Sequence, residues 1–238
     1  KYYEAIQILK DIENDINTPE SLNEELYATY AHTYLRQNKY DQAIPHLKKA
    51  VDFAKKKKNK ARYAFILGHL YQLQNRPVSS DEYFSQVIKL KPGYDLRFHA
   101  NMNLLLNKGL SGGETAEIEK SMLKLLKDPK NKEYEPEIYY SLAQIAKREG
   151  RMDACLNYLV SAVSSPSQAN TVKANAYLML ADIQFEKQQY GLAKNYFDST
   201  LLMMPKNDPR RAYPSKMVAN LKEISEQLDI ISLQDSLI

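Results

Sequence analysis

The chain has 238 residues, of which 44% are hydrophobic and 26% charged, and its formal net charge at pH 7 is +4. This composition is typical of a folded chain and excludes a disordered or fibrous one. No run of eighteen apolar residues occurs, so the sequence predicts no membrane-spanning helix. Its single cysteine excludes an internal disulfide and a metal site built from several thiolates.

One spacing pattern recurs along the whole chain. In most copies a small residue is followed four positions later by a large apolar residue and three positions after that by a small or apolar one, as in Ala43, Leu47 and Ala50. The anchoring positions are separated by 37 or 38 residues: Ala5, Ala43, Ser80, Ile118, Cys155 and Ala193. Such a fixed interval predicts an array of structural repeats.

Each repeat is expected to be a pair of helices. Tyr27, Tyr30, Ala31 and Tyr34 have the i, i+3, i+4, i+7 spacing that places side chains on one helix face. In chain order the expected units are a half repeat at 1–17, hairpins at 22–58, 60–93, 95–130, 135–167 and 172–206, and a terminal helix at 211–229. No window alternates as a strand does, so the sequence predicts one all-α solenoid domain over residues 1–238.

The two ends of the sequence resemble incomplete repeats. KYYEAIQIL is expected to be the second helix of a unit whose first helix is missing, and LDIISLQDSLI is apolar without a polar cap. Terminal repeats normally carry a polar outer face. The sequence therefore predicts a fragment of a longer protein.

Small residues are expected where the two helices of a hairpin cross, because they allow close approach of the backbones. The pairs are Ala31 with Ala43, Gly68 with Ser80, Ala143 with Cys155, and Ala181 with Ala193. The unit at 95–130 departs from this rule. Met102 and Ile118 replace the small pair, and NKGLSGGET from Asn107 to Thr115 is expected to form a long turn, which predicts an opened hairpin and an irregular superhelical pitch there.

Positive charge is concentrated in one segment. Between Lys48 and Arg62 there are eight basic residues and one acidic residue, including the run KKKKNK at 55–60. We expect this run to be a solvated turn between repeats, with a contact to an acidic partner or a lipid surface as the second interpretation. Nucleic-acid binding is disfavoured, because it would need basic residues along a face, interleaved with stacking aromatics.

The repeats resemble the tetratricopeptide repeat family. Leu67, Gly68, Tyr71, Ser80 and Phe84 occupy the family's pattern positions in one unit. Corresponding residues recur in two later units: Tyr139, Leu142, Ala143, Gly150, Cys155 and Ala162, and then Tyr177, Leu180, Ala181, Tyr190, Ala193, Phe197 and Pro205. The period is longer than the family's 34 residues, and tryptophan is absent. The resemblance implies a right-handed α-α superhelix of about five full repeats with terminal half-repeats.

The resemblance also implies a partner-binding inner face, lined by the first helices. Its register assigns these residues to that face: His32, Arg36, Arg62, Phe65, His69, Tyr140, Gln144 and Arg148, with Glu137 nearby. Arginine and aromatic residues are enriched at binding hot spots, so an acidic extended segment or helix is the expected partner. The Lys and Asn set that grips a terminal carboxylate in some family members is absent, since Ala28, His32, Phe65 and His69 stand at such places.

A closer resemblance lies in DPKNKEYEPEIYYSLAQIAKREGRMDACLNYLVSA and KANAYLMLADIQFEKQQYGLAKNYFDSTL. These segments, with LDIISLQDSLI, resemble the PorW/SprE family of periplasmic lipoproteins of type IX secretion and gliding motility. The resemblance implies a noncatalytic envelope scaffold, periplasmic and anchored to the outer membrane by a lipid outside this fragment. The alternatives are a general tetratricopeptide adaptor or co-chaperone and, less favoured, a nucleic-acid-binding helical repeat.

Residues with catalytic or metal-binding potential form no recognisable constellation. The four histidines are widely spaced, and neither an i, i+4 pair nor an HExxH helix occurs. His32 and His69 are expected to be either groove contacts or solvated surface residues. Cys155 is expected to pack in the core, and GLSGGET lacks the lysine and hydroxyl of a phosphate loop. We therefore expect no enzyme activity, no cofactor and no metal.

Overall fold

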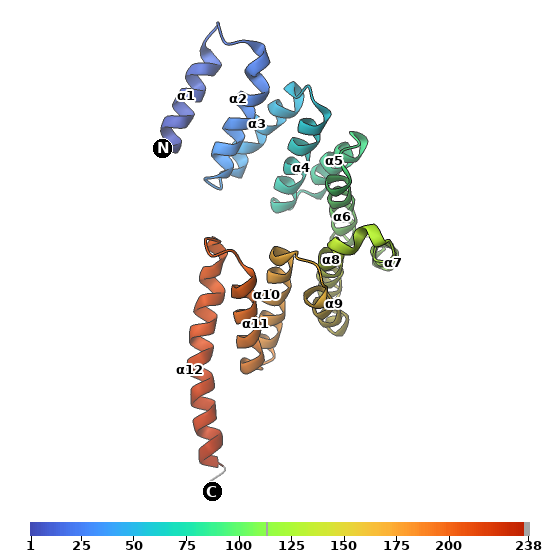
Figure 1. Cartoon of the computed structure of the whole chain (residues 1–238), viewed down its shortest axis with the longest axis vertical. Helices are drawn as coiled ribbons and strands as arrows, with labels where there is room; N and C mark the ends of the chain where they lie inside the picture. The colour runs from blue at the N-terminus through green and yellow to red at the C-terminus, as the bar shows by residue number, and fades with distance from the viewer. Residues whose placement is uncertain (113, 236–238) are drawn as a thin grey trace. The chain divides into compact units, whose positions relative to one another are not determined.

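The computed structural model describes residues 1–112 and 114–235, with backbone only for 225–235. These residues form twelve α-helices and three short 3-10 helices, and no strand occurs among them (Figure 1). The all-α repeat architecture predicted from the sequence is confirmed. The chain divides into two compact units, Lys1–Gly113 and Glu114–Ile238, so one continuous solenoid over all 238 residues stays a prediction.

Unit 1 is a series of helices that pack in sequence order (Figure 1). They are α1 (Tyr2–Asn14), the 3-10 turn Glu20–Leu22, α2 (Asn23–Leu35), α3 (Tyr40–Phe53), α4 (Lys57–Leu73), α5 (Pro77–Lys89) and α6 (Tyr94–Leu110). The hairpins α2–α3 and α4–α5 pack most extensively, and α4 also contacts α6. The first helices α4 and α6 therefore lie side by side within the unit.

Unit 2 repeats the arrangement. It contains α7 (Thr115–Leu125), the 3-10 turn Pro129–Tyr134, α8 (Glu135–Arg148), α9 (Met152–Ser164), α10 (Asn170–Glu186), α11 (Tyr190–Met203), the 3-10 turn Pro209–Arg211 and α12 (Ala212–Asp235). Helix α12 continues past the terminal helix expected at 211–229. The apolar ending LDIISLQDSLI lies outside the residues whose side chains are described.

The small residues predicted at the helix crossings are buried in all four hairpins. Ala31, Ala43, Ser80, Ala143, Cys155, Ala181 and Ala193 are each 0% exposed. Four residues after each second-helix small residue stands a large buried side chain: Leu47, Phe84, Leu159 and Phe197. Since full burial of such a side chain stabilises by about 1.5–3 kcal/mol, this alternation of small and large residues holds each hairpin closed.

The hairpin turns share one backbone geometry. Asn38, Asn75, Gly150 and Gln188 stand at equivalent places and have φ values of 57°, 54°, 72° and 61°. In each turn the next residue donates its backbone N–H to the carbonyl five positions earlier, as Arg76 does to Tyr71 at 2.9 Å. This left-handed cap satisfies carbonyl groups at the end of the first helix and reverses the chain.

The expected long turn from Asn107 to Thr115 is wrong, because α6 continues to Leu110 and α7 starts at Thr115. Asn107 is only 5% exposed. Its amide nitrogen donates to Ser80 Oγ at 3.0 Å and to Asp81 at 2.8 Å, and its amide oxygen accepts from Gln72 at 2.7 Å. These bonds hold the last turn of α6 against α4 and α5. The predicted opening of this hairpin stays a prediction, since α6 and α7 belong to different units.

The lysine run at 55–60 is also not a simple turn. Helix α4 begins at Lys57, so Lys57, Lys58 and Lys60 lie in its first turn. Glu24 of α2 holds this helix start, because its carboxylate accepts from the Asn59 amide at 2.7 Å and from the Tyr63 hydroxyl at 3.4 Å. The interaction joins residues more than thirty positions apart, which local composition does not reveal.

Candidate partner-binding faces

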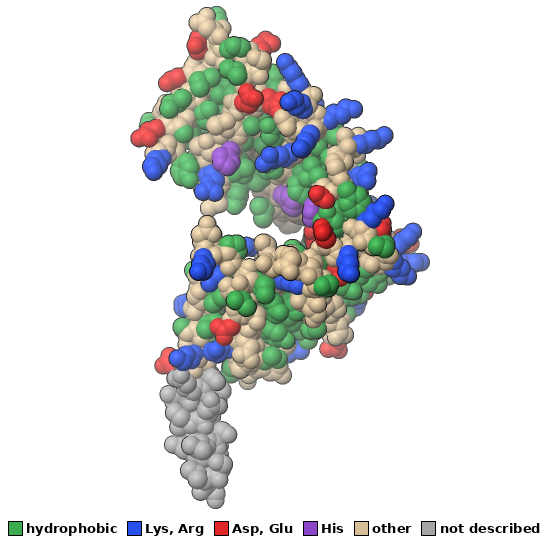
Figure 2. Space-filling model, in the orientation of Figure 1, with side chains coloured by type: hydrophobic (Ala, Val, Ile, Leu, Met, Phe, Trp, Pro, Cys, Tyr) green, Lys and Arg blue, Asp and Glu red, His purple; other side chains and the backbone are tan. Residues whose placement is uncertain are grey.

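The first candidate surface, the unit 1 face, follows the exposed side of α4. Arg62, Phe65 and His69 stand at i, i+3 and i+7, and Arg62 is exposed while the two rings are half-buried. The Phe65 and His69 rings meet edge to face, with centroids 4.6 Å apart at 86°. Figure 2 shows histidine side chains among hydrophobic and basic ones on the surface of unit 1.

The buried ring of Phe84 packs against both the Phe65 ring and the His69 ring. Phe84 of α5 is 0% exposed and lies 5.6 Å from the Phe65 ring and 5.3 Å from the His69 ring. Gly68 makes room for it, because a Cβ there would lie 2.7 Å from a Phe84 ring atom. The aromatic part of the unit 1 face is therefore fixed by the core.

Polar contacts fix His69 further. Its Nδ1 lies 3.3 Å from the Gln72 amide oxygen, and Gln72 in turn donates to Asn107 of α6. His69 is thus half-buried and held by the core, whereas His32 of α2 and Arg36, which follows the end of α2, are exposed. A rigid aromatic and imidazole pair loses little conformational entropy when a partner binds.

His99 of α6 belongs to the unit 1 face although it was not predicted. It precedes Met102 by three residues, as Phe65 precedes Gly68, and its ring lies 6.4 Å from Phe65. The repeat register was the signal that identifies it. With His99, each of the first helices α2, α4 and α6 carries a histidine.

The second candidate surface, the unit 2 face, starts on α8. Tyr140 and Gln144 are half-buried and Arg148 is exposed, with Glu137 half-buried one turn before Tyr140. Burial raises the pKa of Tyr140, although the positive charge of Arg210 acts in the opposite direction. Tyr140 is therefore a neutral phenol close to a guanidinium.

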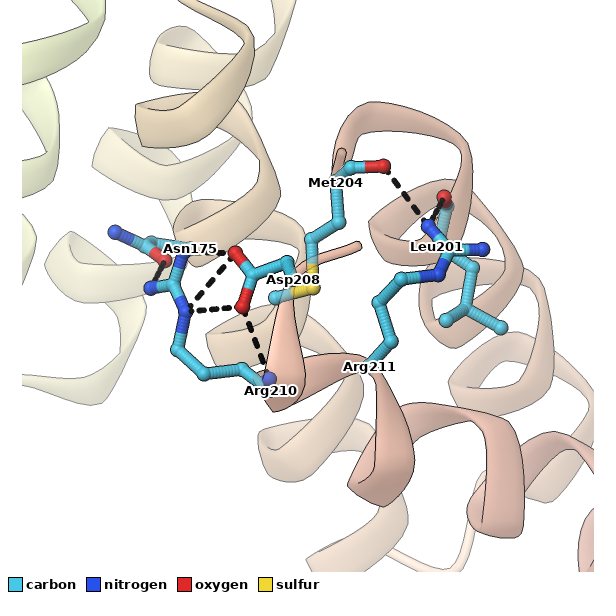
Figure 3. Close-up of polar contacts among 6 residues, drawn as sticks. All are labelled: Asn175, Leu201, Met204, Asp208, Arg210 and Arg211. Atoms are coloured by element: carbon cyan, nitrogen blue, oxygen red, sulfur yellow. Dashed lines mark hydrogen bonds and ion pairs between the residues drawn. The ribbon is translucent and has the colours of Figure 1, made fainter. Parts of the chain in front are cut away.

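Arg210, in the 3-10 turn before α12, connects two repeats across the unit 2 face (Figure 3). Its guanidinium pairs with Asp208 at 2.6 Å and donates to the Asn175 side-chain oxygen of α10 at 3.2 Å. The hydrogen bonds from Arg210 lower the pKa of Asp208 to about 2. Through Arg210 the Asp208 carboxylate is thus held close to Asn175 of α10.

A second polar pair lies further along α10. The Tyr213 hydroxyl of α12 donates to the Asp182 carboxylate at 2.8 Å. Burial raises the pKa of Asp182 despite this bond, and burial together with Asp182 raises the pKa of Tyr213 to about 12. The unit 2 face therefore combines acidic and basic groups, whereas the predicted residues of the unit 1 face are basic or aromatic.

Sequence reasoning missed four residues of the unit 2 face: Asn175, Asp182, Arg210 and Tyr213. The repeat register contained the signal for two of them, since Asn175 and Asp182 correspond in α10 to Glu137 and Gln144 in α8. Arg210 has no such signal, because it lies in a connection outside the helices of the hairpins.

The remaining candidate residue from the sequence, Cys155, lies in the core. Cys155 is 0% exposed, and burial raises the pKa of its thiol, so it packs in the core as predicted. Among the described residues no group of three or more His, Cys, Asp or Glu could hold a metal ion. The same part of the chain contains no helix that is long and apolar enough to cross a membrane.

Comparison with known families identifies the class of protein. The tetratricopeptide repeat family model matches residues 24–57, 61–94, 136–168 and 174–201, which together make up more than half of the chain. This chain belongs to the tetratricopeptide repeat family, whose members are generally noncatalytic scaffolds for protein–protein interaction. No curated protein matches the chain.

The comparison with solved structures gives matches of low sequence identity. PilW, a widely conserved type IV pilus biogenesis factor, is 17% identical with a TM-score of 0.50, over 90% of this chain and 98% of that one. PilF of Pseudomonas aeruginosa is 17% identical with a TM-score of 0.49, over 88% and 87% of the two chains. The TPR2AB-domain:pHSP90 complex of yeast Sti1 is 13% identical with a TM-score of 0.33, over 92% and 90%. At these identities the PilW likeness shows the fold alone.

Proposed function

We propose that this protein is a noncatalytic scaffold that binds an acidic, extended segment of a partner protein along the first helices of its repeats. The unit 1 face supports this proposal most. It combines exposed arginines with aromatic rings that the core already holds in place. Arginine and aromatic anchors in fixed positions are typical of binding hot spots.

The charge of the unit 1 face favours an acidic partner. Arg36 and Arg62 are exposed, and neither makes an ion pair with a described residue. The first turn of α4 carries no acidic side chain. A carboxylate of a partner therefore finds unpaired guanidinium groups, and Phe65 and His69 offer an apolar contact beside them.

The biological setting that we propose is the bacterial envelope. The resemblance to the PorW/SprE family supports a lipoprotein of type IX secretion or gliding motility, periplasmic and held at the outer membrane by an anchor outside these 238 residues. Components of that machinery are then the candidate partners. The alternative is a general adaptor or co-chaperone that binds a peptide in the same place.

The test is a crosslinking pull-down from a native envelope preparation. Arg36→Glu with Arg62→Glu reverses the charge of the unit 1 face, and Arg148→Glu changes the unit 2 face alone. Lys89→Glu with Lys120→Glu is the matched control, since both lysines are exposed outside the two faces. We expect the first variant to lose the partner with unchanged helicity, whereas the control keeps it. Equal capture by all variants would place the partner site elsewhere.

A nucleic-acid-binding repeat is distinguished in the same experiment. Nuclease treatment before crosslinking should leave the captured proteins unchanged if the contact is between proteins. Loss of capture on nuclease treatment, with a steep dependence on salt, would favour the nucleic-acid alternative.

A further inference from the structure

A compact positive knob lies at the start of α4, and it is separate from the aromatic rings of the unit 1 face. Lys55, Lys56, Lys57 and Lys58 are all exposed, and their side chains make no ion pair or hydrogen bond with any described residue. In Figure 2 blue side chains project around the connection between α3 and α4. We call these four lysines the lysine knob.

The lysine knob is held in one place by the fold. Glu24 of α2 accepts hydrogen bonds from the Lys55 backbone N–H at 3.4 Å and from the Asn59 amide at 2.7 Å. The chain before the knob is also anchored, because Ala54 is 8% exposed. The lysine side chains therefore point to solvent from a backbone that is fixed on both sides.

The knob is electrostatically unfavourable for the isolated protein. Lys57, Lys58 and Lys60 lie in the first turn of α4, which has no acidic residue of its own, at the end of the helix where the dipole is positive. The single carboxylate of Glu24 offsets only part of the charge of the surrounding lysines. Neighbouring like charges repel each other as well. An external surface of negative charge would relieve both effects.

An aromatic side chain flanks the knob. Phe53, the last residue of α3, is 41% exposed although its ring stacks on Tyr27 with centroids 5.6 Å apart. Aromatic rings at the boundary between apolar and polar surroundings are typical of membrane-interface contacts. Clusters of four to eight basic residues are typical of binding to anionic lipid surfaces.

We propose that the lysine knob and Phe53 form a docking surface for an anionic lipid bilayer. Lys57 and Lys58 are successive residues of α4 and point about 100° apart around its axis, and Lys55 and Lys56 precede the helix, so the four exposed lysines do not form a row along one helix face. Charges that point in several directions suit an extended, fluid surface of phosphate groups better than a single peptide or nucleic-acid strand. Lysine suits such a surface as a point charge, whereas specific bidentate recognition favours arginine. This contact adds to any lipid anchor outside the chain and does not depend on the proposed partner site.

The test is co-sedimentation of the 238-residue chain with vesicles. The probes are phosphatidylcholine vesicles and vesicles of phosphatidylcholine mixed with phosphatidylglycerol, each at low and at physiological salt. We expect binding to the anionic vesicles only, with weaker binding at higher salt. Replacement of the four knob lysines by Gln should reduce the partition coefficient by about tenfold or more. Phe53→Ser should cause a smaller loss, with helicity checked by circular dichroism.

A matched variant controls for net charge. Lys120, Lys124, Lys127 and Lys130 are exposed in unit 2, and their replacement by Gln removes the same charge. We expect this variant to bind vesicles as the parent chain does. Equal loss in both variants, or no binding of the parent to anionic vesicles at low salt, would overturn the proposal. Tighter binding of polyglutamate or of a single-stranded oligonucleotide than of vesicles would overturn it in favour of another polyanion.

Discussion

The close approach of α4 and α5 at Gly68 predicts that Gly68→Ala destabilises the protein. A Cβ on this residue would lie 2.7, 2.8 and 2.9 Å from three ring atoms of Phe84. The ring has no free space to move into, because Phe84 is 0% exposed and contacts Phe65 and His69. Separation of the two helices would also stretch the hydrogen bond from Ser80 Oγ to the Gly68 carbonyl, which is 2.9 Å long.

Two effects of opposite sign determine how much Gly68→Ala changes the free energy of unfolding. Overpacking of a filled core costs about 1–3 kcal/mol. Replacement of glycine by alanine within a helix returns up to about 1 kcal/mol of backbone entropy. We therefore expect Gly68→Ala to lower the free energy of unfolding by about 1–2 kcal/mol. The measurement is urea unfolding followed by circular dichroism, with hydrogen exchange of the α4 and α5 amides to localise the effect.

Gly191 provides the matched control, since it also lies in a helix and nothing is within 4 Å of its added Cβ. Gly191→Ala should leave stability unchanged or raise it by up to about 1 kcal/mol. The difference between the two variants measures the overpacking alone. Phe84→Leu should cost less in the Gly68→Ala background than in the parent, because the shorter side chain relieves the clash. Equal or greater stability of Gly68→Ala relative to Gly191→Ala would refute the reasoning.

Burial, backbone geometry and hydrogen bonding support four further predictions. Burial lowers the pKa of His46, so this histidine binds a proton at a higher pH in the unfolded chain than in the folded one. Acidification from pH 7 to about 5 should therefore lower the free energy of unfolding. His46→Gln should weaken this pH dependence in urea titrations, and an unchanged pH dependence would contradict the role of His46. The buried Cys155 thiol, whose pKa is raised by burial, should react with a maleimide only after urea unfolding, and rapid reaction of the native protein would be inconsistent with core packing. Gln188 has φ 61°, so Gln188→Gly should raise the free energy of unfolding by about 1 kcal/mol in urea titrations, and an unchanged or lower value would contradict the left-handed geometry of this turn. Arg211 donates to two carbonyl groups at the end of α11 (Figure 3), so Arg211→Ala should lower the free energy of unfolding by about 1–3 kcal/mol, and a urea midpoint equal to that of the parent would exclude this role.

The repeat core could be predicted from the sequence because its requirements are local and periodic. Gly68 and Ser80, like Ala31 and Ala43, stand at fixed distances on two adjacent helices, so one spacing identifies every crossing. The hairpin turns follow the same interval, and Asn75 is a residue type that tolerates the left-handed conformation. Local sterics and side-chain size are thus sufficient for this level of structure.

Errors occurred where contacts between distant residues decide the local structure. The sequence NKGL has the composition of a turn, yet Asn107 extends α6 by hydrogen bonds to Ser80 and Asp81, more than twenty positions away. The lysine run has the composition of a solvated loop, yet Glu24 holds it at the start of a helix. In both cases the hydrogen bonds of one polar side chain to a distant part of the chain stabilise a helix end in residues whose composition is typical of a turn.

The candidate faces could be predicted from the sequence only in part. Register places Phe65 and His69 on one side of α4, and the structure adds that Phe84 and Gln72 hold both rings rigid. Register alone does not predict the charge of a face, because Arg210 reaches the unit 2 face from a connection. The core positions that repeat therefore set where the candidate faces lie, whereas surface positions of the helices, such as Arg62, and residues of the connections, such as Arg210, set the charge of each face. Substitutions at the two kinds of position should separate accordingly: changes at Gly68 should act through stability, and changes at Arg62 should act on binding with stability unchanged.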